Sequence, residues 1–413
     1  MSDPTLLSQA QLVSQRPSQP HLPLLCQSPL LIRGEVQHYQ WGGNAFIPEV
    51  LNIEQTDKPF AELWFGTHGS APSTIVGGAT NLLNYIQANP QTNGGQDKGL
   101  NFLLKILDVR SPLSIQVHPN KSQAEQGFDR ENRQGISLKA FDRNYRDDNH
   151  KPEIMVALTT SYLLYGFSEL GLAINRYQQY PSLQSLAWRL RSDGFERFYP
   201  WLMRLSKTEL QGYLNPLLAQ VISDYRQGQL RKNDHGYWVA RAALEHGGSD
   251  ACDPGLLSML AMNLVRVEPG KGIFQPAQLP HAYLEGANIE LMANSDNVLR
   301  GGLTPKHIDI EELLTVVAIE PCTPEIITPQ KESEGVNRYP IPDCEFSLSH
   351  LSGDSAIPLP AHTGAAVLLN MGAPCRVVSN QFQKKVPKGH AVFIPAGTKV
   401  TVSALSLDCY LAR

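Results

Sequence analysis

Two segments far apart in the chain repeat one pattern of glycine, phenylalanine and proline. Residues 270–277 read GKGIFQPA and residues 389–396 read GHAVFIPA, so in both a glycine leads through phenylalanine to a Pro-Ala corner. Repeated short strands with glycine and proline corners are typical of jelly-roll β-barrels. The repeat predicts two related barrels. Beyond the corner, His281 of the first copy matches Val400 of the second, so we expect only the first to keep a polar site.

The segment 168–246 has a different pattern and predicts helices. Apolar residues recur there at helical spacing, as in Leu214, Leu217, Leu218, Val221, Ile222 and Tyr225. Glycine and proline near Pro181, Pro200 and Gly228 predict breaks between several helices. The expected fold is mainly β with a helical insert: two jelly-roll β-barrels plus an α-helical domain.

These patterns also predict where the domains begin and end. Residues 1–28 are rich in Gln, Ser and Pro, and we expect a disordered tail there. The first barrel is expected in two parts, 29–165 and 251–325, on either side of a helical insert at 166–250. The second barrel is expected at 326–413, as a structural copy without a metal.

Local patterns predict individual elements. Apolar or alternating runs predict strands at 101–107, 154–158 and 264–267. A serine followed by a glycine five residues on predicts a short helix over 122–127, ending at the glycine. Acidic residues around a leucine pair predict a capped helix at 309–314.

Composition excludes several classes of protein. The 413 residues carry a formal net charge of −4, which argues against a general nucleic-acid binder. No apolar run is long enough to span a bilayer, and the first thirty residues lack the pattern of a signal peptide. The cysteines form no CxxC motif and indicate free thiols in a cytoplasmic protein. They are Cys26, Cys252, Cys322, Cys344, Cys375 and Cys409.

One largely apolar stretch also contains several charged and polar residues. It is residues 280–306, which read PHAYLEGANIELMANSDNVLRGGLTPK. It contains His281, Glu290, Asp296 and Arg300 within a predicted turn-strand-turn. Buried charges must be paired or bound to a metal, so this content indicates chemistry rather than packing. The segments 114–118 and 150–153 carry matching polar residues and are the expected partners.

Four side chains in these segments suit a divalent metal. Gln116, His118, Glu153 and His281 offer two imidazoles, one carboxylate and one amide oxygen. That mixture favours zinc, with manganese, iron or cobalt as alternatives. On a strand, Ser114, Gln116 and His118 would share one face. The competing interpretation is a pair of polar residues facing solvent.

Each charged residue near these segments has two interpretations, as part of the site or as an ordinary surface residue. Lys151 beside a metal-binding carboxylate would compete with the ion unless it served an anionic substrate. Lys105 could lie on an edge strand with its ammonium in water. Arg300 could form a surface ion pair, although the glycines after it allow a ligand to approach, and Glu290 could face solvent. If these residues converge, the site suits a hydroxy-carbonyl substrate that carries a phosphate. A carboxylate or lysine of the protein would move a proton of this substrate, and the reaction would pass through an enediolate.

Longer stretches carry a family resemblance, densest over residues 280–306. The others read YQWGG, AELWFGTH, LKILDVRSPLSIQVHP and NHKPE, at 39–43, 61–68, 104–119 and 149–153. Over about residues 30–320 the chain resembles the type I phosphomannose isomerases of the cupin superfamily. The C-terminal part resembles them more loosely, and the long N-terminal segment and Glu285 depart from the pattern.

The resemblance implies a zinc enzyme with one Zn²⁺ per chain and two cupin barrels, and we expect a monomer. It would interconvert mannose 6-phosphate and fructose 6-phosphate through a cis-enediol, serving mannose and nucleotide-sugar metabolism. The implied zinc ligands are Gln116, His118, Glu153 and His281. The implied catalytic residues are Arg300, Glu290 and Lys151, and the implied substrate-binding residues are Lys105, Ser114, Tyr283 and Lys306. The base stays open among Glu290, Lys151 and a metal-bound water.

Two rival functions remain on the sequence alone. Another metal-dependent cupin, such as a dioxygenase, would more often present an H-x-H pair, and Gln116, Lys151 and Arg300 argue against it. A non-catalytic sugar-binding or storage cupin would need neither the metal ligands nor the cations.

Overall fold

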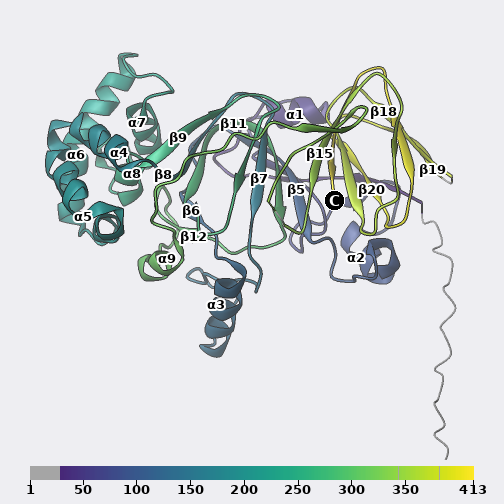
Figure 1. Ribbon diagram of the computed structural model, residues 1–413, viewed down its shortest axis with the longest axis horizontal. Coiled ribbons are helices and arrows are strands. Elements are labelled where there is room, and N and C mark those ends of the chain that lie inside the picture. Colours follow the sequence, from purple (N-terminus) through teal and green to yellow (C-terminus); the bar gives the residue numbers. More distant parts are fainter. Residues whose placement is uncertain (1–27, 343, 381) are drawn as a thin grey trace, which may run out of the picture.

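The computed structural model describes residues 28–342, 344–380 and 382–413. The tail expected at 1–28 and Cys26 therefore lie outside the described residues, apart from Ser28. The molecule has three parts in a row: a group of helices at one end, a sheet in the middle and the C-terminal strands at the other end (Figure 1).

The middle part is a ten-stranded sheet, which we call the central sheet. Its strands are β2 (Glu35–Gln37), β3 (Glu62–Phe65), β5 (Phe102–Val109), β6 (Gln116–Val117), β7 (Glu153–Ala157), β8 (Ser161–Phe167), β9 (Met262–Val267), β10 (Gly272–Gln275), β11 (His281–Ala293) and β12 (Leu299–Arg300). The long strand β11 pairs with β5 and β7 along one half and with β6 and β8 near its start. The three strands expected from local patterns are confirmed.

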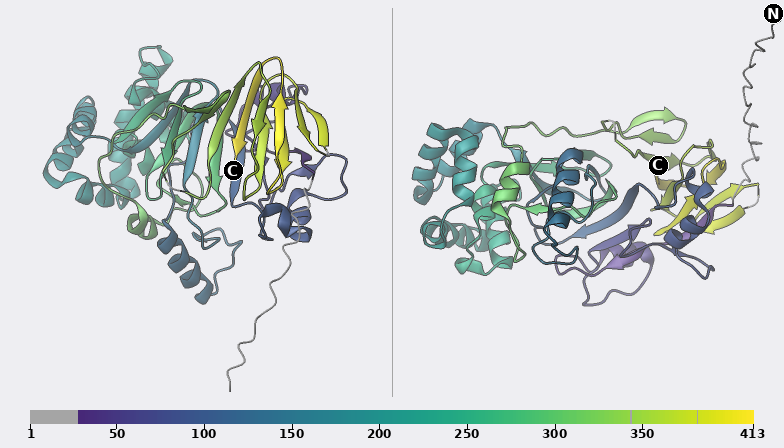
Figure 2. Two further views of the ribbon diagram at one scale, coloured as in Figure 1. Left: turned by 45° about the vertical axis from the view of Figure 1, so that its right-hand side comes forward. Right: turned by 90° about the horizontal axis from the view of Figure 1, so that it is seen from below.

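The C-terminal part contains an eight-stranded and a four-stranded sheet, which we call the C-terminal sheet pair (Figure 2). The larger sheet has the order β13 (Gln330–Ser333), β14 (Val336–Arg338), β15 (Leu348–Gly353), β22 (Leu407–Ala412), β17 (Ala366–Asn370), β20 (His390–Ile394), β1 (Leu30–Arg33), β4 (Thr74–Ile75). The smaller has the order β16 (Ile357–Leu359), β21 (Val400–Ser403), β18 (Cys375–Ser379), β19 (Phe382–Val386). The repeated sequence segments form β10 and β20, so both copies are strands.

The first strand of the described chain belongs to the C-terminal sheet pair. Strand β1 pairs with β20, with Ile32 opposite Ala391, and on its other side with β4. This pairing ties residues 30–33 to the C-terminal strands, although they precede the central sheet in sequence.

Alternation along the strands separates the two faces of the central sheet. On β5, Leu104 and Ile106 join a core that also contains Phe393 of the eight-stranded sheet. Lys105 and Leu107 point to the opposite face because successive strand residues alternate. That opposite face is where the polar residues gather.

The helices follow the expected helical region, with additional short helices outside it. They are α1 (Phe46–Leu51), α2 (Leu82–Ala88), α3 (Lys121–Arg133), α4 (Leu170–Gln178), α5 (Gln184–Met203), α6 (Lys207–Arg226), α7 (His235–Glu245), α8 (Pro254–Ser258) and α9 (Ile310–Val316). Short 3-10 helices are η1 (Pro90–Asn93), η2 (Pro181–Leu183) and η3 (Gly248–Asp250). Helices α4 to α8 cap the end of the central sheet away from the C-terminal strands (Figure 1). No helix in the described ranges is long and apolar enough to cross a membrane.

The break expected at Pro200 was wrong. Pro200 lies inside α5, and the kink falls instead at Gly194, where φ is 65°. A positive φ suits glycine, which has no Cβ to clash with the backbone. Pro200 follows six residues later, inside the helical segment that continues after the kink.

The helix expected over 122–127 is longer than predicted. Helix α3 begins after Asn120, whose side chain and that of Gln123 form a capping box, and it continues to Arg133. Gly127 does not end it. A Cβ on Gly127 would lie 2.4 Å from the Tyr145 ring, so the glycine serves close packing. The helix expected after Asp309 is confirmed as α9.

Candidate active site

Three of the expected metal ligands meet in one buried cluster. His118 follows β6, Glu153 opens β7 and His281 opens β11, and their exposed fractions are 1%, 3% and 3%. The Nε2 atoms of His118 and His281 lie 3.5 and 3.3 Å from the two Glu153 oxygens. One potential ligand atom from each residue lies within 4.8 Å of the others. The interpretation of His118 as a solvent-facing residue was therefore wrong.

Backbone contacts fix the orientation of both imidazoles. The Nδ1 of His118 donates to the Asn297 carbonyl at 2.8 Å, and the Nδ1 of His281 donates to the Leu279 carbonyl at 3.0 Å. In the neutral ring this leaves the Nε2 lone pair directed at Glu153. Burial, reinforced by Lys151, lowers the pKa of His118 well below its ordinary value.

This arrangement fits a bound cation. The Nε2 of His118 is buried and has no hydrogen-bond partner, and it faces a carboxylate oxygen. A lone pair and a carboxylate repel each other unless a positive ion lies between them. The donor set of two imidazoles and one carboxylate leaves room for a further ligand, as catalytic metal sites require.

Gln116 lies next to this cluster through strand pairing. It is the cross-strand partner of His281 on β11 and of Arg300 on β12. Directly opposite residues in an antiparallel pair point to the same face. The pairing therefore places the Gln116 side chain on the same side as His281.

Lys151 contacts the carboxylate of the cluster. Its Nζ lies 3.3 Å from Glu153, and the lysine is buried. Burial by itself would raise the pKa of Glu153, but Lys151, His118 and His281 outweigh it and hold the pKa well below its ordinary value. Glu153 is therefore ionised, as a metal ligand must be.

A second polar group lies on the same face of the central sheet, where Lys105 and Glu290 are cross-strand partners. The Nζ of Lys105 lies 2.9 Å from one Glu290 oxygen, and the Tyr283 hydroxyl donates to the other at 2.9 Å. Gln275 donates to the Tyr283 hydroxyl at 3.0 Å. Lys105 and Glu290 are 6% and 4% exposed, so the interpretations that placed them in solvent were wrong.

The ionisation of this group follows from its burial and pairing. Burial favours the neutral lysine, but Glu290 and Glu62 outweigh it and raise the pKa of Lys105. Burial and the charge of Glu290 raise the pKa of Tyr283 well above its ordinary value. Lys105 therefore stays charged and Tyr283 stays a hydrogen-bond donor.

Glu62 is a member of this group that the sequence interpretation missed. It lies on β3, 4.0 Å from Lys105, and accepts a 2.5 Å hydrogen bond from Trp64. Burial raises its pKa. The signal was present, because Glu62 is a charged residue in the apolar run AELWF, as Lys105 is in NFLLKIL.

Three cationic side chains act on one another near Gln116, and they belong to Arg146, Arg300 and Lys306. Burial and then the charge of Arg146 lower the pKa of Arg300. Burial, followed by Arg300 and Arg146, lowers the pKa of Lys306. Among the described residues, Arg300 and Lys306 form no ion pair, so the surface ion pair considered for Arg300 was wrong. Arg146 was missed by the sequence interpretation because it lies in a polar loop without periodicity. Ser114, half-buried, precedes β6.

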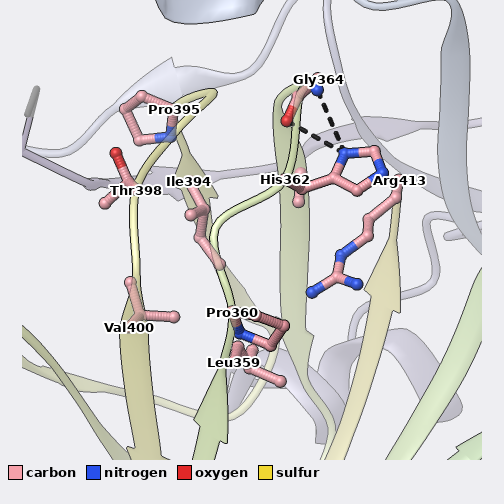
Figure 3. Close-up of a pocket in the computed structure, with 10 residues that line it drawn as sticks. Leu359, Pro360, His362, Gly364, Ile394, Pro395, Thr398, Val400 and Arg413 are labelled. Atoms are coloured by element: carbon pink, nitrogen blue, oxygen red, sulfur yellow. Dashed lines mark hydrogen bonds between the residues drawn. The ribbon is translucent and has the colours of Figure 1, made fainter. Parts of the chain in front are cut away.

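The C-terminal sheet pair has a different interior. Its core is apolar, with Val377, Val400 and Leu411 among its buried residues. A small hollow there is lined mostly by apolar side chains and prolines, with His362 bonded to Gly364 at its rim (Figure 3). Among the described residues, the cluster of His118, Glu153 and His281 is the one group of three or more His, Cys, Asp or Glu that could hold a metal.

The nitrogen and oxygen ligands of the cluster are buried and leave a position for a further ligand, and cations lie nearby. Such a site is typical of a metalloenzyme that acts on an anionic substrate.

Comparison with known proteins gives the family. Residues 30–170 match the model of the phosphomannose isomerase type I catalytic domain. The mannose-6-phosphate isomerase of Escherichia coli K12 is 34% identical over 385 residues, which cover 89% of this chain and 95% of that protein. The Salmonella typhimurium LT2 enzyme is 37% identical over 76% of this chain and 81% of its own length.

Solved structures agree with this assignment. The mannose 6-phosphate isomerase of Salmonella typhimurium bound to fructose 6-phosphate and zinc superimposes with a TM-score of 0.83 at 32% identity, covering 94% of this chain and 99% of that one. The apo form of the Salmonella enzyme gives a TM-score of 0.82 at 31% identity, with coverages of 94% and 98%. The chain belongs to the type I mannose-6-phosphate isomerase family.

Proposed function

We propose that this chain is a zinc-dependent isomerase that interconverts mannose 6-phosphate and fructose 6-phosphate. The observation that carries the proposal is the buried cluster of His118, Glu153 and His281, with an unpartnered Nε2 facing a carboxylate. The relatives bear this activity in their names, and one solved relative holds zinc and fructose 6-phosphate.

Gln116, His118, Glu153 and His281 would hold the zinc ion. The ion would supply a Lewis acid that polarises the substrate carbonyl and hydroxyl. The two Nδ1 contacts to backbone carbonyls keep both rings turned toward the site. The buried surroundings keep these polar interactions strong by excluding water.

The reaction itself is a transfer of protons within one sugar. One proton moves from C2 to C1 and another from O2 to O1, through a cis-enediol. Lys151 and Glu290 are the candidate proton carriers, and the base stays open between them and a metal-bound water. Arg300, the cross-strand partner of Gln116, would stabilise negative charge on the enediolate oxygens.

The contacts of Glu290 favour a particular role for it. Lys105 occupies one of its oxygens and Tyr283 the other. A carboxylate with both oxygens engaged accepts a substrate proton less readily than a free one. Glu290 would therefore hold Lys105 and Tyr283 in place for the sugar, and would take a proton only when Tyr283 turns away.

The substrate phosphate would bind to the cations that lack partners. Arg146 and Lys306 would contact it, with Ser114 as a hydroxyl donor. Cations without a carboxylate partner are costly next to one another, and a dianionic phosphate would relieve that repulsion. Burial and Arg146 lower the pKa of Arg300, and burial, Arg300 and Arg146 lower the pKa of Lys306, which supports this placement.

We also propose the wider setting implied by the family. Residues 29–165 and 251–325, which contain most of the central sheet, would form a catalytic cupin barrel interrupted by a helical domain at 166–250. Residues 326–413 would form a metal-free cupin-like barrel, which β1 completes. The enzyme would act as a cytoplasmic monomer that supplies mannose and nucleotide-sugar metabolism.

A coupled assay tests the proposal. Purified protein is given mannose 6-phosphate, formation of fructose 6-phosphate is followed, and the assay is repeated with a chelator and then with added zinc. We expect turnover that the chelator abolishes and zinc restores. Zinc-replete protein that turns over no hexose phosphate would instead favour a non-catalytic sugar-binding protein.

A further inference from the structure

Asn297 is a fully buried asparagine whose side chain joins two segments of the site. It lies between β11 and β12 and is 0% exposed. Its Oδ1 accepts hydrogen bonds from the backbone N–H groups of Arg146 (2.7 Å) and Asp147 (3.2 Å). Its Nδ2 donates to the backbone carbonyls of Asp147 (2.8 Å) and Asn149 (2.9 Å). One side chain thus fixes the backbone of residues 146–149.

The backbone of the same residue holds a metal ligand. The Asn297 carbonyl accepts the hydrogen bond from His118 Nδ1 at 2.8 Å. The loop fixed by its side chain leads within a few residues to Lys151 and Glu153. Asn297 therefore contacts one ligand directly and the segment that delivers another.

Hydrogen bonds from Ser295 and Asp296 stabilise this arrangement. The Ser295 hydroxyl donates to Asp147 Oδ1 at 2.7 Å and contacts the Asn149 carbonyl at 3.1 Å, and the Asn297 N–H donates to that hydroxyl at 3.2 Å. The Asp296 N–H donates to the other Asp147 oxygen at 2.7 Å. Every polar atom of the Asn297 side chain is satisfied, so the loop has a defined position.

We propose that Asn297 is a positioning residue that sets the zinc affinity of the site and presents Arg146 to the substrate phosphate. The inference rests on the metal centre of the proposed function. A loop that is already ordered need not be ordered by the ion, so binding is tighter. Partners that orient metal ligands typically change metal affinity or activity by about 10- to 100-fold when removed.

Asn370 provides a matched control in the C-terminal sheet pair. It is also 0% exposed, its Nδ2 donates to the Ala373 and Val386 carbonyls at 3.1 and 3.0 Å, and its Oδ1 accepts from Gly372 at 3.2 Å. Replacing either asparagine with alanine removes two hydrogen bonds to backbone carbonyls, together with the acceptor of two backbone N–H groups at Asn297 and of one at Asn370. The two variants therefore carry similar structural damage and differ in their distance from the metal centre.

The test measures zinc dissociation constants by competition with a chromophoric chelator, together with thermal unfolding of the zinc-free proteins. We expect Asn297→Ala and Asn370→Ala to lower the unfolding temperature comparably. Only Asn297→Ala should weaken zinc binding, by about 10- to 100-fold. With zinc saturating, it should also raise the KM for mannose 6-phosphate more than it lowers kcat, because Arg146 is displaced.

Zinc binding by Asn297→Ala within twofold of the wild type, or an equal loss in Asn370→Ala, would overturn the inference. If Asn297→Ala does not fold, Ser295→Ala replaces it, with a smaller but measurable loss of zinc affinity expected and an unchanged affinity counting against the proposal. Wild-type protein that binds zinc without isomerase activity would refute the proposed reaction and the role of Arg146, and would leave the inferred effect of Asn297 on zinc affinity intact. Wild-type protein that binds no zinc would refute both.

Discussion

The central sheet buries a group of charged side chains beside its apolar residues, whereas the core of the C-terminal sheet pair is mostly apolar. The repeated segments become β10 in one and β20 in the other. In the central sheet, Lys105 and Glu290 lie buried together, whereas Val377 and Leu411 occupy the core of the C-terminal pair. The same strand-and-corner pattern therefore supports an interior with buried charges in one region and a mostly apolar interior in the other.

The difference shows what each interior stabilises. A buried ion pair contributes little net stability, because the loss of hydration offsets the attraction between the charges. Apolar side chains at close packing stabilise the fold directly. We infer that substitutions in the central sheet affect chiefly the chemistry, and that substitutions in the C-terminal pair affect chiefly the free energy of unfolding.

The largest effect should come from the histidine at the matched position of the repeat. His281→Ala removes a proposed zinc ligand, and we expect zinc content and kcat to fall together, kcat by about 1,000-fold or more. Val400→Ala at the matching position should keep kcat within about twofold and lower the free energy of unfolding by about 2 kcal/mol. Metal analysis, kinetics and denaturant unfolding check both. Full zinc occupancy in His281→Ala would show that the ligand assignment is wrong.

Arg300, the cation proposed to act on the substrate, should affect kcat and leave the zinc content unchanged. Arg300→Ala should keep zinc and folding and lower kcat by about 100- to 1,000-fold, because it stabilises charge that develops in the transition state. Arg376→Ala, at an exposed position of β18 in the C-terminal pair, is the control and should leave kcat unchanged. A near-normal kcat in Arg300→Ala would contradict its catalytic role.

A partly buried histidine outside both interiors tests whether burial of a polar group is enough to make a site. Burial, with the charge of Arg176, lowers the pKa of His235 to about 4, despite its bond to the Met262 carbonyl and the nearby Asp234. The unfolded chain, with a histidine pKa near 6.5, binds more protons between pH 6.5 and 4. Stability is thus fully present above pH 6.5 and is lost as the pH falls, by about 2 kcal/mol at pH 5.

His235→Gln removes this titration. The difference in the free energy of unfolding between pH 8 and pH 5 should be about 2 kcal/mol smaller in the variant than in the wild type. Urea unfolding at the two pH values measures it. Identical pH profiles would show that His235 is not held neutral, and kcat at pH 8 should not change.

The smallest effects should come from two buried hydroxyls. Tyr283→Phe removes the donor to Glu290, and Tyr410→Phe removes a hydroxyl that contacts Tyr339 in the C-terminal pair. Each should lower the free energy of unfolding by about 1 kcal/mol. Only Tyr283→Phe should also lower kcat, by about tenfold. Equal kcat values in the two variants would show that Tyr283 takes no part in the reaction.

Much of the fold was predictable because local patterns decide it. Strands β5, β7 and β9, the helical region and α9 follow from periodicity and capping residues that need no distant partner. The kink at Gly194 and the passage of α3 through Gly127 were not predictable. They depend on how a glycine is used in three dimensions, and Gly127 serves the distant ring of Tyr145.

The site was predictable in its residue types and less so in its contacts. His118, Glu153 and His281 come from three separate segments, and their convergence followed from family resemblance rather than from spacing. Asn297 could not be recognised from sequence, because its importance lies in hydrogen bonds to a loop about 150 residues away. Glu62 could have been found by applying the test used for Lys105, a charge within an apolar strand.

The place of β1 within the eight-stranded sheet has a consequence for biosynthesis. Ile32 emerges from the ribosome roughly 360 residues before its partner Ala391, a delay of about 20 to 70 s at typical rates of translation. Until then β1 lacks its principal neighbour, and the C-terminal strands cannot complete their sheet from their own residues. Nascent chains should therefore close this sheet late, only after β20 and β22 have been made.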